Sequence, residues 1–462
     1  MQLDVRILDR ALEMGASFCD LRTERRRGLS LEFKDGLLHE AIPGDEKGLC
    51  VRVLLGGAWG ISSTNDLSAG GTASALSSAL KLARAKASCM KRGEAVRLAP
   101  VKPLRMKVAW KPASDPRDIS IERKHGYLRD MSKSAMARPG VKSVTARYFD
   151  GQRTMELVSS EGADVRMELT RSLADVSMVV KNDKGMLSNR ASVGGTAGWE
   201  IHERSRLDEK GVAAADAAMN MLNGRRAPSG RFPVVADPVL AGVFAHEAVG
   251  HACEGDLVIA GDSCLEGMMG RRIATAGLSL FDDPTIKGAF GSFPFDDEGV
   301  LARTKPLIEK GSLRGFMLDR ESASRLDMEP NGGARAESYS ARPLVRMSNT
   351  AIAAGDRSRD EIFEGISLGI YAVGTRGGQV DTSKGSFQFS CREAYLIENG
   401  EVTGPLRSLA LSGRILETLK EVDAIGKDLR IEDPGYCGKG QTVPVGDGGP
   451  HIRIRSAFVG GG

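Results

Sequence analysis

The stretch Asp237–His251, with the sequence DPVLAGVFAHEAVGH, is one of three helical patterns that the chain contains beyond residue 230. Asp237 can serve as a helix N-cap, and Pro238 suits the first helical turn, so we expect a helix, the motif helix, to begin here. The other two patterns lie near residues 319–326 and 357–366. Because the remaining sequence shows glycine-rich strand and turn patterns, we expect a β-rich domain with few helices.

The chain is predicted to divide at a segment of turn-forming residues, Asn223-Gly224-Arg225-Arg226-Ala227-Pro228-Ser229-Gly230. We therefore expect a β-rich C-terminal domain over residues 226–462, which carries the motif helix. Its last strand is predicted from the alternation of apolar and charged residues in Ile452-Arg453-Ile454-Arg455.

The first half, residues 1–225, is predicted to be an α+β region in which helices pack on an antiparallel sheet. It could divide into two subdomains, residues 1–95 and 115–225, joined by a proline-containing crossover over residues 93–115. Apolar spacing predicts helices over residues 3–14, 66–90, 117–139 and 207–222. Strand patterns cover residues 29–33, 50–62 and 141–197, with glycine turns at Lys34-Asp35-Gly36 and Gly56-Gly57. The expected fold class is α+β.

Charge and composition argue against several function classes. The chain has 462 residues, 64 basic and 60 acidic side chains and a net charge of +4, which predicts neither a nucleic-acid nor a membrane partner. No apolar stretch reaches the roughly 18 residues of a membrane span, and the first residues lack the apolar core of a signal peptide. Seven cysteines at irregular spacing argue against a disulfide framework. We therefore expect a cytoplasmic protein with free thiols.

The hexapeptide His246-Glu247-Ala248-Val249-Gly250-His251 contains two of the six histidines of the chain. Neutral imidazole is a common zinc ligand, and an adjacent carboxylate can act as a general base. His246 and His251 are therefore predicted metal ligands, and Glu247 is a predicted catalytic base. The alternative is a buried helix in which both histidines bond to local carbonyl groups.

The spacing of the two histidines requires a deformed helix. At about 100° per residue, positions i and i+4 lie about 40° apart around the axis, whereas i and i+5 lie about 140° apart. A shared metal therefore needs a π-bulge, or an end to the helix just before His251. Because Gly250 can adopt the left-handed conformation, we expect the helix to unwind near Gly250 and to return His251 toward His246.

A catalytic zinc usually has three protein ligands, so one ligand is still to be found. The residues considered for this role are Cys253, Glu254, Cys264, Glu266, Cys391 and Cys437. Cys437 is favoured because glycines on both sides let its backbone approach a metal, and because a turn would expose its thiol. Lys439 would also favour the thiolate. The other candidates stay open.

The chain resembles the TldD/PmbA family of metalloproteases along nearly its whole length. The segments that carry the resemblance are Gly48–Val53, Gly57–Gly60, Ser63–Asp66, His246–Asp256, Asp296–Gly299, Arg346–Thr350, Gly377–Asp381, Leu396–Gly400 and Cys437–Gly446. In this family the TldD branch keeps the two-histidine motif and is catalytic, whereas PmbA-type partners, also called TldE, lack it. Because this chain keeps the motif, it is similar to the catalytic branch.

The resemblance implies one Zn²⁺ per chain, bound by His246, His251 and Cys437, with Glu247 as the general base. It also implies peptide or unfolded-protein substrates, bound as an added strand along an edge of the C-terminal sheet. A dimer is expected, either with a second copy or with a PmbA/TldE-type partner that lacks the motif.

Two alternative functions remain open. One is a non-catalytic peptide-binding or assembly partner that holds a structural metal. The other is a peptidase of the dipeptidyl-peptidase III type, in which a glutamate is the third metal ligand. In either case Cys253 is a further thiol close to the motif that could compete as a ligand.

Overall fold

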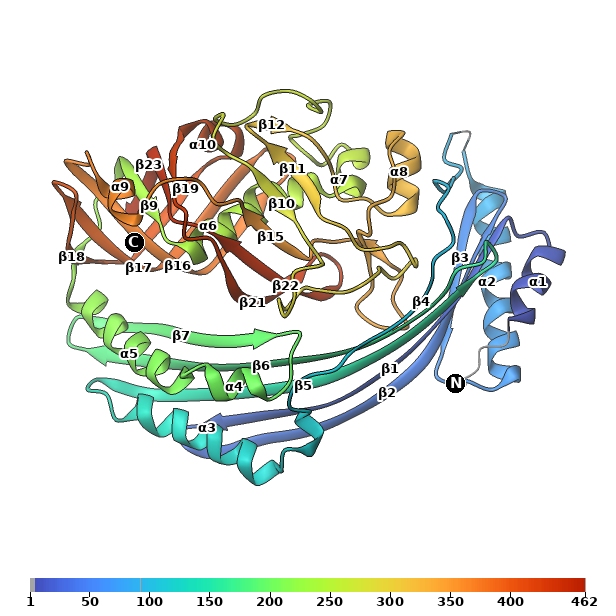
Figure 1. Cartoon of the computed structure of the whole chain (residues 1–462), viewed down its shortest axis with the longest axis horizontal. Coiled ribbons are helices and arrows are strands. Elements are labelled where there is room, and N and C mark those ends of the chain that lie inside the picture. The colour runs from blue at the N-terminus through green and yellow to red at the C-terminus, as the bar shows by residue number, and fades with distance from the viewer. Residues whose placement is uncertain (1–4, 92, 462) are drawn as a thin grey trace.

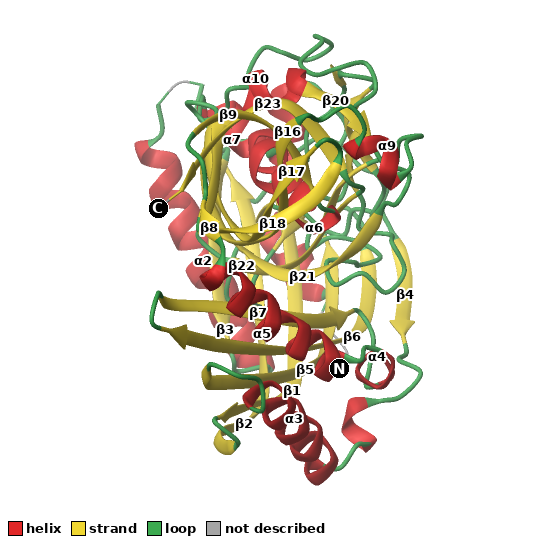
Figure 2. Ribbon diagram, turned by 90° about the vertical axis from the view of Figure 1, so that its left-hand side faces the viewer, coloured by secondary structure: helices red, strands yellow, loops and turns green. Residues whose placement is uncertain are grey.

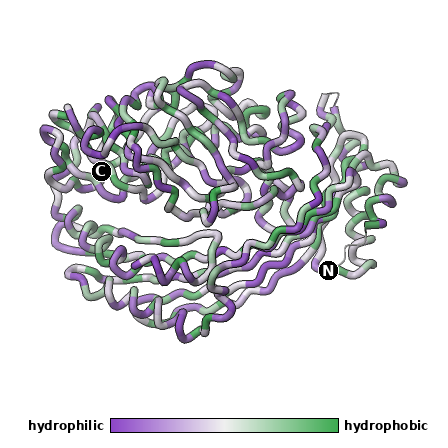
Figure 3. The backbone as a smooth tube through the Cα atoms, in the orientation of Figure 1, coloured by the Kyte–Doolittle hydropathy of each residue, from purple (hydrophilic) through white to green (hydrophobic). Residues whose placement is uncertain are grey.

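The computed structural model describes residues 5–91 and 93–461, and it has the α+β fold that the sequence predicts. A long, curved sheet from the first half of the chain lies beneath a body of shorter strands from the second half (Figure 1). Hydrophobic and hydrophilic residues alternate along the long strands, as a sheet with two different faces requires (Figure 3).

The long sheet has seven strands. They are β1 (Phe18–Lys34), β2 (Leu37–Leu55), β3 (Ala58–Thr64), β4 (Arg105–Trp110), β5 (Val141–Ser159), β6 (Asp164–Asn182) and β7 (Gly185–Gly195). Their order is β3-β2-β1-β5-β6-β4, and β7 also pairs with β6. Gly56 and Gly57, with φ of 59° and 78°, form the predicted tight turn between β2 and β3.

Strand β4 corrects one expectation. The segment 93–115 was expected to be only a crossover, but it contains β4, which runs parallel to β6. The alternating burial of β4 is weak because only intermediate positions alternate with exposed ones. Its strand conformation therefore depends on the partner strand more than on its own sequence.

The helices of the first half are α1 (Arg6–Glu13), α2 (Ala69–Cys89), a short 3₁₀ turn η1 (Pro116–Asp118), α3 (Ile121–Met136), α4 (Glu200–Arg204) and α5 (Leu207–Asn223). Helices α3, α4 and α5 lie on the face of the long sheet that points away from the second half, and α1 and α2 pack at its other end (Figure 1). The four helices predicted for this half are confirmed, although residues 3 and 4 of the first lie outside the described residues.

The second half contains an eight-stranded sheet that closes on itself. Its strands are β8 (Arg225–Arg226), β9 (Gly230–Ala236), β16 (Leu368–Asp381), β17 (Ser386–Glu398), β18 (Glu401–Arg407), β19 (Leu409–Arg414), β20 (Val422–Ile425) and β23 (Ile452–Gly461). Because β16 pairs with both β9 and β17, the path β16-β9-β23-β19-β17 returns to its start. Viewed from the side, these strands curve around α6 above the long sheet (Figure 2).

A second, six-stranded sheet lies beside this closed sheet. It consists of β10 (Leu280–Asp282), β11 (Lys305–Glu309), β12 (Ser312–Leu313), β15 (Asn349–Ile352), β21 (Arg430–Gly438) and β22 (Thr442–Gly449). In the order β12-β11-β10-β15-β22-β21, strand β21 forms one edge. A separate pair joins β13 (Ala334–Arg335) to β14 (Leu344–Val345).

The helical segments of the second half are α6 (Pro238–Phe244), a π-helix η2 (Ala245–Gly250), a 3₁₀ turn η3 (His251–Cys253), α7 (Gly255–Ala260), α8 (Arg320–Leu326), α9 (Arg359–Phe363) and α10 (Ile415–Glu421). Helices α8 and α9 confirm two predicted patterns, and each begins with a capping box. Helices α7 and α10 were not predicted. Across residues 5–91 and 93–461, no helix combines the length and the apolar character that a membrane span needs.

Candidate metal centre

The motif helix begins as the sequence predicts. Asp237 caps α6, because its Oδ1 accepts a hydrogen bond from the backbone N–H of Leu240 at 2.9 Å. The same oxygen accepts from the N–H of Gly374 at 2.8 Å, which ties the start of α6 to β16 of the closed sheet. The helix is therefore anchored to the body of the domain before the chain reaches the histidines.

A π-helix places both histidines on one face. After Phe244 the chain continues as η2, and the backbone N–H of His251 donates to the carbonyl of His246, five residues earlier. In this bonding pattern residues i and i+5 lie one above the other, which an α-helix does not allow. The two imidazole rings consequently meet edge to face, with centroids 5.1 Å apart.

The expected unwinding at Gly250 is wrong. Gly250 has φ of −55° and ψ of −56°, a right-handed helical conformation. A Cβ atom at this position would lie 2.1 Å from Sδ of Met347. The glycine is therefore needed because Met347, which is fully buried, packs directly against the helix.

Cys437 approaches the histidines from the edge strand β21. Its Sγ lies 3.4 Å from Nε2 of His251, and the ligand atoms of His246, His251 and Cys437 all lie within 4.8 Å of one another. The expected turn around Cys437 is wrong, since the residue is paired with Val443 inside a strand and is only 5% exposed. The chain turns after Gly438, where the N–H of Lys439 donates to the carbonyl of Gln441.

Two carboxylates orient the imidazole rings. Asp447 accepts a hydrogen bond from Nδ1 of His246 at 2.7 Å, and Glu254 accepts one from Nδ1 of His251 at 2.9 Å. Each ring is thereby held with Nε2 free to face the cluster, the arrangement in which carboxylates support metal-bound histidines. Glu254, considered as a third ligand from the sequence, lies on the far side of His251.

The protonation states follow from these contacts. Burial raises the pKa of the Cys437 thiol, but hydrogen bonds and positive charge from His246 and His251 outweigh burial and lower it to about 5. Burial lowers the pKa of His251, but its bonds to Cys437 and Glu254 raise it to about 9. The sulfur is therefore held as a thiolate, the form in which cysteine binds metals.

The three donors fit a catalytic zinc. Imidazole nitrogens and thiolates are ligand types that zinc prefers, and His246, His251 and Cys437 would supply the three protein ligands that a catalytic zinc usually has. This cluster is the one group of three or more metal-binding side chains present in the described part of the chain. Cys253 is fully buried in the hydrophobic core, where burial raises the pKa of its thiol, and it lies outside the cluster.

The other candidate ligands also lie outside the cluster. Cys391 is buried in the hydrophobic core, and Cys264 and Glu266 lie in the segment after α7, where the backbone N–H of Cys264 donates to the carbonyl of Thr382. None of these three residues belongs to a group of three or more metal-binding side chains in the described part of the chain.

Glu247 lies beside the cluster with its carboxylate in the cleft. Its Oε2 is 3.9 Å from Nε2 of His251, and about a quarter of its side chain, 26%, is exposed. Burial raises the pKa of this carboxyl group, and the positive charges of both histidines offset only part of the increase. A carboxylate with a raised pKa accepts a proton from water more readily than an ordinary one.

A network of buried charges fixes the segment after Cys437. Arg346, which is completely buried, donates to the carbonyls of Cys437 and Gln441. Lys439 was expected to favour the thiolate, but its ammonium group pairs with two carboxylates instead. Its Nζ lies 2.9 Å from the carboxylate of Asp256 and 3.3 Å from that of Glu254. Both cations therefore stabilise residues around the cluster, Arg346 through backbone carbonyls and Lys439 through carboxylates.

The cluster opens into a large cavity, the metal cleft, of about 1000 Å³. Residues of the long sheet, including Asn189 and Arg190 of β7, form one wall. The opposite wall comes from the second half, with Thr375–Val380 of β16 and Pro434–Gly438 of β21. The cleft is thus lined by both halves of the chain, and the edge of β21 runs along it.

The chain is similar to known proteins along nearly its whole length. The chain matches PmbA/TldA metallopeptidase domain 1 over residues 19–87, the central domain over residues 114–222 and the C-terminal domain over residues 229–461. It is 42% identical over 451 residues to a metalloprotease of Methanothermobacter thermautotrophicus, covering 97% of both chains. It is 30% identical to a zinc metalloprotease TldD homolog of Saccharolobus solfataricus, covering 98% of this chain and 99% of the other. The crystal structure of TldE from Thermococcus kodakarensis has the same fold, with a TM-score of 0.78, 19% identity and 99% of both chains covered.

Proposed function

The chain belongs to the PmbA/TldD family of metallopeptidases, and from this premise we propose that it is a zinc-dependent peptidase that hydrolyses unfolded peptides or small proteins. The observation that carries the proposal is the convergence of His246, His251 and Cys437 beside Glu247 in an open cleft. One Zn²⁺ per chain is proposed, because the described residues offer one such cluster.

Zinc at this position would supply Lewis acidity, which lowers the pKa of a bound water toward neutrality and polarises the scissile carbonyl group. The protein contributes the proton transfer. Glu247 accepts a proton from the attacking water at a carboxylate oxygen and passes it to the leaving amide nitrogen. Asp447 and Glu254 keep the two imidazoles oriented during this reaction, since they hold the Nδ1 atoms.

The substrate is proposed to bind as an added strand on the free edge of β21. This strand pairs only with β22 among the described residues, and its residues Pro434–Gly438 line the metal cleft. Main-chain hydrogen bonds recognise an extended peptide largely independently of its side chains. A folded protein cannot present a free strand, so unfolded chains are the expected substrates.

The proposed setting is a dimer in the cytoplasm. All seven cysteines are free, which supports a reducing compartment. The partner is either a second copy or a motif-lacking PmbA/TldE-type chain, since a TldE structure shares this fold. Light scattering of the purified chain, alone and mixed with such a partner, distinguishes the two assemblies.

The deciding experiment is the variant Glu247→Gln, which keeps the size of the side chain and removes the base. Cleavage of an unfolded protein should fall by roughly 10²–10⁴-fold, the range that general-base catalysis supplies, while the zinc content stays unchanged. Glu266→Gln is the matched control, because Glu266 also lies in this domain but outside the cluster.

If Glu247→Gln cleaves as fast as the unaltered chain, the peptidase mechanism is wrong. If neither protein cleaves peptides but both bind them and retain zinc, the chain is a non-catalytic binding partner with a structural metal. Binding of the substrate as an added strand is tested with one substrate protein in two forms, native and reduced and unfolded. Only the unfolded form should be cleaved.

A further inference from the structure

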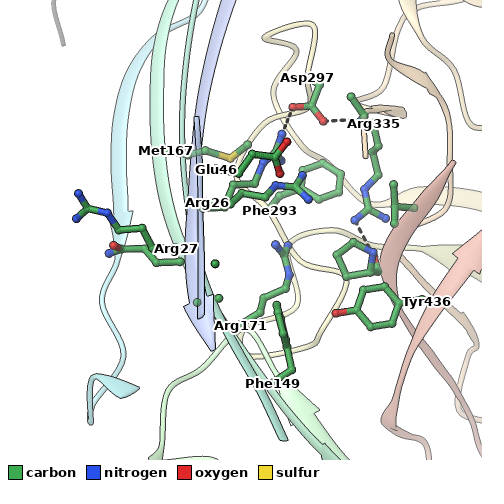
Figure 4. Close-up of a pocket in the computed structure, with 18 of the residues that line it drawn as sticks. Arg26, Arg27, Glu46, Phe149, Met167, Arg171, Phe293, Asp297, Arg335 and Tyr436 are labelled. Atoms are coloured by element: carbon green, nitrogen blue, oxygen red, sulfur yellow. Dashed lines mark hydrogen bonds and ion pairs between the residues drawn. The ribbon is translucent and has the colours of Figure 1, made fainter. Parts of the chain in front are cut away.

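A second cavity, the arginine cavity, lies between the long sheet and the second half of the chain and has a volume of about 360 Å³ (Figure 4). Sites for small organic ligands are of this size. Its walls come from β1, β2, β5 and β6 on one side and from β13, β21 and β22 on the other. Tyr436, the neighbour of the proposed ligand Cys437, lines both this cavity and the metal cleft.

Arg171 of β6 enters the cavity as a buried cation without a carboxylate partner. Its Nε donates to the carbonyl of Phe290 at 2.8 Å, and its Nη2 donates to the carbonyl of Ser292 at 2.7 Å. Its Nη1 has no protein acceptor among the described residues. Carbonyl groups satisfy hydrogen bonds but do not neutralise a guanidinium, so the positive charge of Arg171 stays uncompensated.

Arg335 of β13 enters the cavity from the opposite side and is likewise a buried cation without a carboxylate partner (Figure 4). Its Nη1 and Nη2 donate to the carbonyls of Met347 and Pro444 at 2.5 and 2.6 Å. The guanidinium lies over the ring of Phe293, 5.1 Å from its centroid. Burial lowers the pKa of Arg335 to about 9, and the positive charge of Arg171 adds to this effect.

Three acidic residues line the cavity; Asp296 and Asp297 are already occupied, and the third, Glu46 of β2, has an exposed side chain. Asp297 forms ion pairs with Arg153 at 2.6 Å and with Arg22 at 3.6 Å. The oxygens of Asp296 accept hydrogen bonds from the backbone N–H groups of Glu298, Val300 and Ala334. None of the three carboxylates forms an ion pair with Arg171 or Arg335 among the described residues, and five arginines line the cavity, so it keeps an excess of positive charge.

Apolar side chains and glycines form much of the remaining lining, together with the charged or polar residues Arg26, Glu46, Gln152 and Arg153. Aromatic and sulfur-containing side chains surround the two guanidinium groups; they are Phe149, Met167, Phe293, Phe295 and Tyr436. On the sheet side, Gly28 of β1 pairs with Gly44 of β2 and with Gly151 of β5, so three adjacent strands present no side chain at this level. A Cβ atom on Gly44 would meet no atom nearer than 4.0 Å, so this glycine leaves open space, whereas a Cβ atom on Gly28 would lie 2.1 Å from the carbonyl oxygen of Asp150.

We propose that the arginine cavity is a second binding site, which takes a carboxylate attached to an apolar or aromatic body. Two cations on opposite sides match the negative charge, and Arg binds carboxylates in a planar, directional way. The apolar walls favour an organic acid over a bare inorganic anion. The terminal carboxylate of a peptide and an acidic side chain next to an aromatic residue share this chemistry.

The first test compares probes on the unaltered, zinc-loaded chain by calorimetry. N-acetyl-phenylalanine carries the carboxylate and the ring, its amide carries only the ring, and acetate carries only the charge. We expect the acid to bind at least tenfold more tightly than the amide or acetate. Equal affinities for the acid and the amide would overturn the proposal, and this result needs no variant.

The second test locates the site. The variants Arg171→Leu and Arg335→Leu should each weaken binding of the acid at least tenfold, with folding checked by thermal melting. Arg147→Leu is the matched control, because Arg147 also lies on the long sheet, on β5, but it pairs with Glu32 and does not line the cavity. Unchanged affinity in a folded Arg171→Leu variant would contradict the assignment.

The third test separates this site from the proposed metal. Zinc also binds carboxylates, so the acid is titrated against Cys437→Ser, which should lack the metal. Retained binding supports the arginine cavity, whereas binding lost in Cys437→Ser but kept in Arg171→Leu places the probe on zinc and overturns it. Failure of the peptidase proposal would leave these outcomes unchanged.

Two peptides then identify the source of the carboxylate. Acetyl-Ala-Phe has a terminal carboxylate, and acetyl-Phe-Glu-amide has only that of its side chain. Tight binding of the first indicates recognition of a peptide end, and tight binding of the second indicates recognition of an acidic residue. If neither binds more tightly than acetyl-Ala-Phe-amide, the cavity does not serve peptide carboxylates.

Discussion

The metal cleft and the arginine cavity share Tyr436 as a lining residue, but they differ in the partners that the protein provides for buried cationic groups. In the cleft, each imidazole has a carboxylate partner: Asp447 for His246, and Glu254 for His251. In the cavity, the guanidinium groups of Arg171 and Arg335 donate hydrogen bonds only to carbonyl oxygens among the described residues. One set of cationic groups is neutralised by the protein, and the other is not.

This difference separates a site arranged for a cation from one arranged for an anion. Carboxylates behind the histidines supply the negative charge that a divalent metal would need, and the thiolate of Cys437 supplies more. An unpaired buried guanidinium is unfavourable until an anion joins it. The charge carried by the ligand can therefore be inferred from the partners that the protein provides.

The largest expected effect is the loss of zinc in Cys437→Ser. A hydroxyl group is a far weaker zinc ligand than a thiolate, so the affinity for zinc should fall by at least about a thousandfold, or about 4 kcal/mol. Competition with a chromophoric chelator measures this change. Cys264→Ser is the control, because Cys264 is half-buried outside the cluster. Intact zinc binding in Cys437→Ser would favour a glutamate as third ligand, as in the dipeptidyl-peptidase III scheme.

The pH dependence of zinc binding should be nearly as large. The raised pKa values of His246 and His251, about 9 for the latter, mean that both imidazoles are protonated at pH 7 in the metal-free protein. The thiol of Cys437, with a pKa lowered to about 5, has already lost its proton. Zinc must displace about two protons, so its affinity should rise roughly a hundredfold per pH unit between pH 6 and pH 8.

Calorimetry in buffers with different ionisation enthalpies counts these protons directly. The increase should become less steep above about pH 9, where His251 becomes neutral without help from the metal. Release of a single proton at pH 7 would show that one imidazole is already neutral, and the proposed balance of charge in the cleft would then be incorrect.

Asp447→Asn should weaken zinc binding by a smaller amount. The amide can still contact Nδ1 of His246, but it removes the negative charge that supports the ring, and such changes reduce metal affinity by about 10–100-fold. Asp262→Asn, an exposed site in the same domain, is the control. Binding of N-acetyl-phenylalanine in the arginine cavity should not change. If Asp447→Asn weakens both ligands equally, the two sites are not independent.

The local part of the proposed metal site can be recognised in the sequence, whereas the residues that support it cannot. The pattern of His246, Glu247 and His251 lies within six residues, so its chemistry can be recognised directly. Asp447 lies 201 positions after His246, and no local spacing connects the two. Cys437 was favoured by its glycine neighbours and by family resemblance, but its strand conformation depends on pairing with β22.

The same limit applies to the fold. The long helices α2, α3 and α5 were predicted because apolar spacing accumulates over 16 to 21 residues. Helices α7 and α10, with 6 and 7 residues, are too short to show a period. Strand β4 depends on its parallel partner β6. Signals that accumulate along the chain are therefore visible in the sequence, and those supplied by a distant partner are not.

Gly250→Ala is expected to have the smallest effect, and it tests why the π-helix needs this glycine. The spacing of the histidines required a deformed helix, but it could not choose between an unwound end and a π-helix. The structure places Gly250 in a right-handed conformation against Met347. An added methyl group should therefore destabilise the fold through overpacking, by about 1–2 kcal/mol in denaturant unfolding.

The double variant Gly250→Ala with Met347→Ala separates the two explanations. If contact with Met347 is the reason for the glycine, truncation of the methionine makes room, and the alanine should then cost less than about 0.5 kcal/mol relative to Met347→Ala alone. If the glycine were required for a left-handed backbone, the cost of the alanine would persist at about 1 kcal/mol in either background. Zinc affinity measured in the same variants adds a second readout, because a displaced π-helix would move His251 away from Cys437. A double variant that recovers stability and zinc affinity together would show that packing by Met347, far from either ligand in the sequence, holds the two histidines on one face.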